Sequence, residues 1–114
     1  MIELTNKTCI PCRTGAASAS ATEIAEWLQQ LPGWKILAID DVKRLVRSYK
    51  FKTFQQALNF TSRVGELAEA EQHHPELLTE WGKVRVSWWT HKIGGLHHND
   101  FIMAAKTDRL FFGD

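Results

Sequence analysis

The chain has 114 residues, of which 44% are hydrophobic and 11% aromatic. This length suits one domain, and the hydrophobic fraction is ordinary for a globular protein. Lys plus Arg number 14 and Asp plus Glu 13, a net charge of +1 that argues against a nucleic-acid binder acting through bulk charge. No apolar run approaches the ~18–20 residues of a membrane helix, so we expect no membrane partner. The N-terminus lacks the pattern of a signal peptide, and we expect a cytoplasmic protein.

The first part of the chain, residues 1–19, is rich in small and polar residues and is predicted to be a mobile arm. It contains a single C-x-x-C pair, Cys9 and Cys12. One such pair supplies two of the four ligands of a structural zinc, so a reduced pair is the simplest interpretation. Half of a shared metal site and a redox role are the alternatives. Residues 20–114 are expected to form a single domain.

The next segment predicts a helix followed by a hairpin. A Ser-x-x-Glu capping box at residues 20–23 marks the helix start, and Pro-Gly at 32–33 ends the helix. Its apolar stripe consists of Ile24, Trp27, Leu28 and Leu31. Residues 34–39 and 44–51 have strand character, and two aspartates between them suit a tight turn.

The second half of the chain repeats this order with a longer helix. Thr53 and Gln56 have capping-box spacing, and the helix is predicted to run to about residue 72 because Pro75 forbids continuation. Its apolar stripe consists of Phe54, Ala57, Phe60, Val64 and Leu67. Residues 77–81 and 84–90 read as strands joined at Gly82. The last helix is predicted from Phe101, Ile102, Ala105 and Leu110.

The predicted order is therefore α-β-β-α-β-β-α. Hairpin-spaced strands give an antiparallel sheet, and the apolar stripes require the helices to cover one face of it. We expect an α+β fold with a four-stranded antiparallel sheet and three helices packed on one face.

All five histidines fall between residues 73 and 98. Histidine has an unperturbed pKa near ~6.5, so it can give and take protons at neutral pH. Two of them, His73 and His74, lie at a predicted helix end, and His91 lies at a predicted strand end. Glu69 precedes His73 by one helical turn, so we expect this carboxylate to orient the His73 imidazole.

The alternation of side chains along the last strand separates two faces. Val84, Val86 and Trp88 should face the helices. Trp89 and His91 should lie on the open face, where an aromatic wall can stack a flat heterocycle and exclude water. The pattern favours acid–base chemistry, since no nucleophile elbow or nearby cysteine supports nucleophilic catalysis.

Simpler interpretations remain open for each of these residues. His73 and His74 also suit a polar helix terminus. The pair at 97–98 is most simply a solvated loop, and Asp100 is a first-turn acid of the last helix. Trp34, after Pro-Gly, is more often a core residue than a substrate contact.

A metal site is a further alternative, because three histidines and a water form a known catalytic zinc arrangement. Adjacent histidines do not easily converge on one ion, however, and the sequence contains no HExxH spacing. A protein-interaction module with a secondary or vestigial site is the alternative from another class.

The histidine pattern resembles that of the pterin-4a-carbinolamine dehydratases. The matching residues are Glu69, His73, His74, Pro75, Trp81, Thr90, His91, Gly94, Gly95, Leu96 and Asp100, with Pro32-Gly33-Trp34 and the segment from Tyr49 to Phe54 upstream. The likeness covers roughly residues 20–112. It implies a dimer or tetramer that dehydrates 4a-hydroxytetrahydropterin to the quinonoid dihydropterin without metal or cofactor. That reaction would recycle the tetrahydrobiopterin cofactor of aromatic amino acid hydroxylases.

The resemblance also implies roles for individual residues. His73 and His91 would handle protons at the 4a-hydroxyl and a ring nitrogen, and His74 would mainly hold the pterin. The site would be lined by Gln72, Trp89, Thr90 and Lys92 and supported by Glu69, Asp100 and Trp34. Trp89 and Lys92 depart from the residues common in the family, and Trp89 could narrow the pocket. Some members of the family act as coactivators or near molybdopterin metabolism, so both remain alternatives.

Overall fold

The computed structural model describes residues 19–113. The elements are α1 (Ala21–Leu28), β1 (Lys35–Ile39), β2 (Val42–Lys50), α2 (Phe54–Glu71), β3 (Glu76–Glu80), β4 (Lys83–Trp88), a 3-10 turn η2 (His91–Ile93) and α3 (His98–Phe112). The predicted order of helices and strands is confirmed. The predictions for Cys9 and Cys12 and for the rest of residues 1–18 lie outside the described residues.

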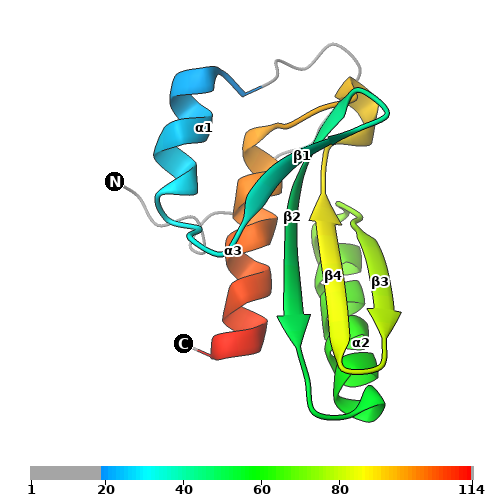
Figure 1. Ribbon diagram of the computed structural model, residues 1–114. Coiled ribbons are helices and arrows are strands. Elements are labelled where there is room, and N and C mark those ends of the chain that lie inside the picture. Colours follow the sequence, from blue (N-terminus) through cyan, green and yellow to red (C-terminus); the bar gives the residue numbers. More distant parts are fainter. Residues whose placement is uncertain (1–18, 114) are drawn as a thin grey trace.

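The four strands form one antiparallel sheet in the order β1-β2-β4-β3. The central pair, β2 and β4, places Leu45 opposite Trp88, and β3 pairs Glu76 with Ser87. Figure 1 shows α2 behind β3 and β4, with α3 alongside it. Within residues 19–113, α2 and α3 cover one face of the sheet and no helix covers the other. An antiparallel sheet with helices on one face is what the sequence predicts.

The two predicted capping boxes differ in the structure. At α1, the Ser20 hydroxyl accepts from Glu23 N and the Glu23 carboxylate accepts from Ser20 N, which is the complete box. At α2, the Thr53 hydroxyl accepts from Gln56 N, but the Gln56 side chain accepts from Lys52 N instead of Thr53 N. The second box is thus only half formed, yet the helix begins where the sequence predicts.

The hairpin between β1 and β2 turns at two aspartates with positive φ, Asp40 at 53° and Asp41 at 63°. Successive left-handed residues form the type of turn whose twist matches that of paired strands, and aspartate tolerates this conformation well. The turn sets the register Ile39–Val42 and, through it, the pairing of Ile36 with Leu45.

The core fills the space between the sheet and the helices. Its sheet side comes from Leu45, Tyr49, Val84, Val86 and Trp88, and its helix side from Ala57, Phe60, Val64, Ala68 and residues 101–105 of α3. Phe54 was predicted to join this stripe, but its side chain is 46% exposed. It is the first residue of α2, where the helix extends past the edge of the core.

Candidate active site

A fully buried carboxylate, Asp100, organises one end of the sheet. His73 Nε2 donates to Oδ1 at 2.7 Å, while the Thr90 hydroxyl and the His97 backbone N–H donate to Oδ2 at 2.8 and 2.9 Å. An ionised carboxylate only accepts hydrogen bonds, so it holds the proton of His73 on Nε2. The His73 side chain is only 9% exposed, and Nδ1 is the ring nitrogen left for another partner.

The end of α2 explains how His73 reaches this carboxylate. Gln72 has left-handed geometry with φ 54°, Gln72 N–H donates to Glu69 O, and His73 N–H donates to Ala68 O. These two bonds form a Schellman motif, which ends a helix and turns the chain sharply. His73 is therefore no longer on the helical surface, and its ring enters the interior beside Trp88, with the ring centroids 5.8 Å apart.

This geometry corrects the expectation for Glu69. The prediction paired Glu69 with His73, on the assumption that both lie on one helical face. The structure pairs the Glu69 carboxylate with His74 Nε2 instead, and both side chains are largely exposed. The reason is the Schellman turn, which directs His73 inward to Asp100 and brings the next residue back toward Glu69.

The loop after β4 folds Thr90 and α3 together. Thr90 and Gly95 form an isolated antiparallel bridge, with Thr90 N–H donating to Gly95 O at 2.8 Å, and Gly94 adopts φ 61°. His97 then caps α3: its Nδ1 accepts from Asn99 N, and Asp100 completes the capping box. The expectation of a solvated loop histidine is wrong for His97, because it positions the helix that carries Asp100.

His98 also has a packing role that the sequence did not indicate. Its ring stacks on Trp27 of α1, with centroids 4.1 Å apart and planes 8° apart. Trp27 also contacts Phe101, so α1 packs against the start of α3 through this aromatic group. The loop interpretation is therefore wrong for both histidines of the pair.

His91 lies at the exit of β4 and is exposed, in a ring contact with Trp89 at a centroid distance of 4.5 Å. The guanidinium of Arg44, from β2, lies over the Trp89 ring at 4.0 Å. Within residues 19–113, no hydrogen bond or ring contact joins His91 to His73 or His74. The two candidate proton carriers are connected instead through Thr90, which precedes His91 and shares the Asp100 carboxylate with His73.

The three imidazoles lie just beyond the paired part of β3 and β4. The β3–β4 ladder ends where Glu76 faces Ser87, so His73 and His74 precede it and Trp89 and His91 follow it at the same end of the sheet.

The remaining predicted site residues fall into two groups. Gln72 and Lys92 are exposed near the histidines, and the Gln72 amide donates to Glu69 O at 2.7 Å. Trp34 is elsewhere: it is buried, and its Nε1 contacts Asp108 in the second half of α3. Asp108 follows Asp100 by two helical turns, about 12 Å along the axis. The structure therefore supports the core interpretation of Trp34.

Asp108 forms a separate polar group on the helix side of the sheet. It accepts from Trp34 Nε1, from Arg47 at 3.0 Å and from the Tyr49 hydroxyl. Burial, with the neighbouring Asp108 carboxylate, raises the pKa of Tyr49 well above its usual value of 10.0. These contacts hold the C-terminal half of α3 against β2, while the contacts of Asp100 hold the N-terminal end of α3.

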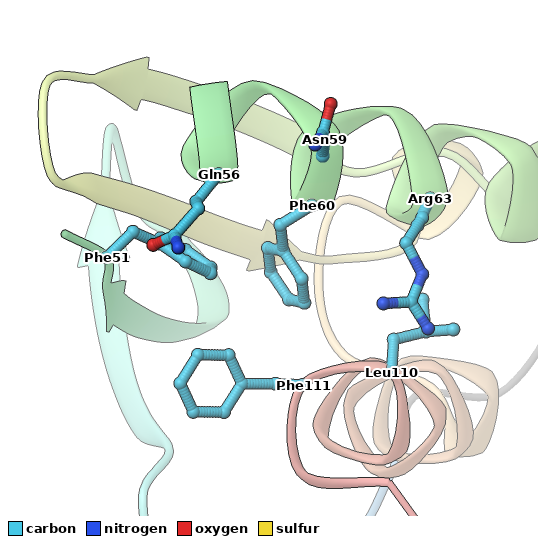
Figure 2. Close-up of a pocket in the computed structure, with 7 residues that line it drawn as sticks. All are labelled: Phe51, Gln56, Asn59, Phe60, Arg63, Leu110 and Phe111. Atoms are coloured by element: carbon cyan, nitrogen blue, oxygen red, sulfur yellow. The ribbon is translucent and has the colours of Figure 1, made fainter. Parts of the chain in front are cut away.

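A hollow of about 240 Å³ lies between α2 and α3, away from the histidines. Figure 2 shows the rings of Phe51, Phe60 and Phe111 converging there, with Gln56 and Arg63 at the margin.

Among residues 19–113, no three His, Cys, Asp or Glu side chains are placed to hold a metal ion together. In the same part of the chain, no helix is both long and apolar enough to span a membrane.

Comparison with known proteins identifies the family. The model of the pterin 4 alpha carbinolamine dehydratase family matches residues 17–110. The chain belongs to this family. The match includes every residue of the Asp100 group and all five histidines.

Curated relatives and a solved structure agree with this membership. Two bacterial proteins provisionally named pterin-4-alpha-carbinolamine dehydratase are similar over nearly their whole length. The one from Syntrophotalea carbinolica is 59% identical over 96% of this chain and 98% of its own, and the one from Chlorobaculum tepidum 56% over 96% and 99%. A crystal structure described as a transcriptional coactivator/pterin dehydratase from Brucella melitensis has a TM-score of 0.74 and 32% identity, covering 82% of this chain and 98% of that one. Membership and these names support a dehydratase activity on a pterin.

Proposed function

We propose that the protein dehydrates a 4a-hydroxytetrahydropterin to the quinonoid dihydropterin by histidine acid–base catalysis. The observation that carries this proposal is the His73–Asp100 pair, because a buried carboxylate that holds one ring nitrogen leaves the other available for proton transfer. The family match supplies the substrate class.

The reaction requires two proton transfers and no redox partner. The C4a–O bond breaks, and the hydroxyl leaves as water after gaining a proton. A ring N–H loses its proton, and the electron pair left on nitrogen forms the new C=N bond. Positioned acid–base groups typically accelerate such transfers by about 10²–10⁴-fold each.

The residues divide into carriers, contacts and supports. His73, through Nδ1, and His91 are proposed to carry the two protons, and His74 to hold the pterin. Trp89 offers a ring face against which the flat heterocycle can stack. The contacts are completed by Gln72, Thr90 and Lys92, and Glu69 and Asp100 support His74 and His73 through the bonds described above.

The activity is tested by following decay of a chemically generated 4a-hydroxytetrahydropterin by ultraviolet absorbance. The protein should accelerate decay well above the buffer rate, and His73→Gln and His91→Gln should each lower kcat by about 10²-fold or more. His97→Asn is the matched control, because asparagine is a strong N-cap and the side chain of His97 only caps α3. Decay no faster than in buffer, with the protein folded, would refute the function.

The fate of the product is also a proposal. Quinonoid dihydropterin can be reduced and reused, so the protein would recycle tetrahydrobiopterin for an aromatic amino acid hydroxylase in the cytoplasm. Deletion of the gene should then raise the level of 4a-hydroxypterin breakdown products only while such a hydroxylase is active. An unchanged level during hydroxylase turnover would contradict this role.

A homodimer or homotetramer is proposed from the apolar side chains left at the surface. Phe54 and Leu58 of α2 are 46% and 42% exposed, and Trp81 at the β3–β4 turn is 75% exposed. Exposed apolar groups of this size are typical of interaction surfaces. Light scattering should give a mass of two or four chains, and Leu58→Glu should lower it if α2 forms the contact.

A protein-interaction role is the second candidate, supported by the same exposed side chains and by the coactivator description of the Brucella protein. This role predicts partner binding that persists in a variant with His73, His74 and His91 all replaced by alanine. Loss of partner binding in that variant, with the fold intact, would exclude an independent interaction role.

A further inference from the structure

The open face of the sheet carries a polar group next to the histidine site. It consists of Arg44 on β2, Glu76 on β3, and Arg85 and Ser87 on β4. These positions alternate with Leu45, Leu77 and Val86 on the helix-covered side, so their side chains lie on the opposite face. Two guanidinium groups and one carboxylate give this group of four residues a formal charge of +1.

Three polar atoms in this group are buried and unpaired. Ser87 is 1% exposed although it lies on the open face, and among residues 19–113 its hydroxyl has no hydrogen-bond partner. The Nε atoms of Arg44 and Arg85 are likewise buried without a partner in that part of the chain. Leaving a buried polar group unpaired is energetically unfavourable, so three such atoms together point to a missing ligand.

The Nε atoms of both arginines are covered in this structure, and Glu76 lies beside both guanidinium groups. Arg44 approaches Glu76 through Nη1 at 3.6 Å and Arg85 through Nη2 at 3.8 Å, both longer than a hydrogen bond. The edge formed by Nε and a terminal nitrogen binds carboxylate and phosphate oxygens in pairs. Glu76 is half-exposed and loosely held, so it can move aside while an incoming anion takes both edges.

This group is continuous with the candidate active site. The Arg44 guanidinium lies 4.0 Å from the centre of the Trp89 ring, and Trp89 is in ring contact with His91. A heterocycle stacked near Trp89 would therefore extend a substituent toward Arg44 and Ser87.

We propose that Arg44, Arg85 and Ser87 form an anion subsite that binds a phosphate or carboxylate group on the side chain of the pterin. The inference rests on the proposed pterin site and refines it, because it makes a pterin with an anionic side chain the preferred substrate class. The Ser87 hydroxyl would donate to the anion, the two Nε edges would bind it, and Trp89 would hold Arg44 in place.

The test compares pterins that differ in their side chain. Binding of 6-hydroxymethylpterin, its phosphate monoester and 6-carboxypterin to the full chain is measured by quenching of pterin fluorescence at low salt. At least one anionic pterin should bind about tenfold more tightly than the neutral one. The tighter of the two identifies phosphate or carboxylate as the group recognised.

Variants test whether Arg44, Arg85 and Ser87 cause the preference for an anionic pterin. Arg44→Gln should remove it, and Arg63→Gln on α2, a matched loss of one exposed arginine, should leave it intact. If Arg44→Gln does not fold, Ser87→Ala takes its place, since it deletes only a buried unpaired hydroxyl and should lower the preference several-fold. Equal affinity for neutral and anionic pterins in the unmodified protein would overturn the subsite. A preference for the anionic pterin that survives Arg44→Gln, or Ser87→Ala where that variant is used, would also overturn it.

A second measurement separates this inference from the dehydratase function. Inorganic phosphate is titrated while the Arg44 and Arg85 Nε–H and Ser87 amide signals are followed by NMR. If no pterin binds and no dehydration occurs, phosphate-dependent shifts that Arg44→Gln abolishes would still support an anion site, and their absence would refute it. Dehydration of neutral pterins without any anion preference would refute the subsite and leave the dehydratase intact.

Discussion

Replacing Asp100 by Asn tests whether the buried carboxylate controls His73. Asparagine has nearly the same shape, but one of its two terminal atoms is a donor. Its oxygen can take the place of Oδ2, which accepts from Thr90 and from the His97 N–H, because two donors meet there. The amide NH₂ then faces His73 Nε2, which must give up its proton to accept a hydrogen bond.

The expected cost to stability is small because only one of the three bonds changes character. A charge-assisted bond contributes about 1.5–3 kcal/mol and a neutral one about 1 kcal/mol, so Asp100→Asn should cost about 1–2 kcal/mol. For a domain of this size, that lowers Tm by about 4–8 °C. Asp100→Ala would instead leave three donors unpaired, two of them buried, and is expected to disrupt folding.

The expected cost to activity is much larger. In the Asn variant, the proton of neutral His73 moves to Nδ1, the nitrogen left for the substrate, so the imidazole can no longer accept a proton there. Loss of one acid–base contribution should lower kcat by about 10²–10⁴-fold, with a smaller effect on KM.

Two measurements test these effects of Asp100→Asn on the His73 tautomer and on kcat. Long-range ¹H–¹⁵N NMR should show the His73 proton on Nε2 in the unmodified protein and on Nδ1 in the Asn variant, and the absorbance assay gives kcat. A switched tautomer with kcat within about threefold of the original would show that His73 transfers no proton. An unchanged tautomer would refute the hydrogen-bond argument itself.

Three further predictions concern neighbouring features. Thr90→Val leaves Asp100 with one donor fewer and should lower Tm by about 4–8 °C, whereas Thr90→Ser should lower it by less than half as much; equal losses would contradict a role for the hydroxyl. Because burial raises the pKa of Tyr49, the stability that the neutral phenol confers is complete below pH 10 and declines as the pH rises above it, so Tyr49→Phe should flatten the fall in Tm between pH 9.5 and 11.5. Tyr49 is the only tyrosine, so absorbance at 295 nm should show phenolate only on unfolding, and ionisation in the folded protein would refute this. Gly82→Ala places a side chain at φ 74° with its Cβ 3.2 Å from Phe51 O, so urea unfolding should show a loss of about 1–2 kcal/mol, and an unchanged midpoint would contradict the strain.

Local patterns in the sequence were enough to predict the helices and strands of the fold. Hairpin spacing, alternation in β4 and the apolar stripes depend on neighbouring residues, and they predict every α-helix and strand within a few positions, but not the η2 turn. The errors occurred at element ends. The strand after Gly82 stops at Trp88 instead of Thr90, because the bridge from Thr90 to Gly95 folds the chain into the η2 turn.

The candidate site follows less completely from the sequence. Spacing and family resemblance select the three histidines and Thr90, but they give Asp100 only a supporting role and favour a solvated loop for His97. A capping pattern, His97 followed three residues later by Asp100, was present in the sequence. This pattern is a weak signal, because histidine is a less common N-cap than Ser, Thr, Asp or Asn.

The sequence alone determined which residues can exchange protons, which face of β4 each side chain occupies and where α2 must stop. These properties follow from side-chain chemistry, strand alternation and the geometry of proline. Only the tertiary structure decided the partners. Because of the Schellman turn, His73 pairs with Asp100 and His74 pairs with Glu69. Packing of α3 against β4 buries the Asp100 carboxylate beside Thr90. Contacts between elements distant in the chain depend on how the elements pack, and residue spacing within one element does not encode them.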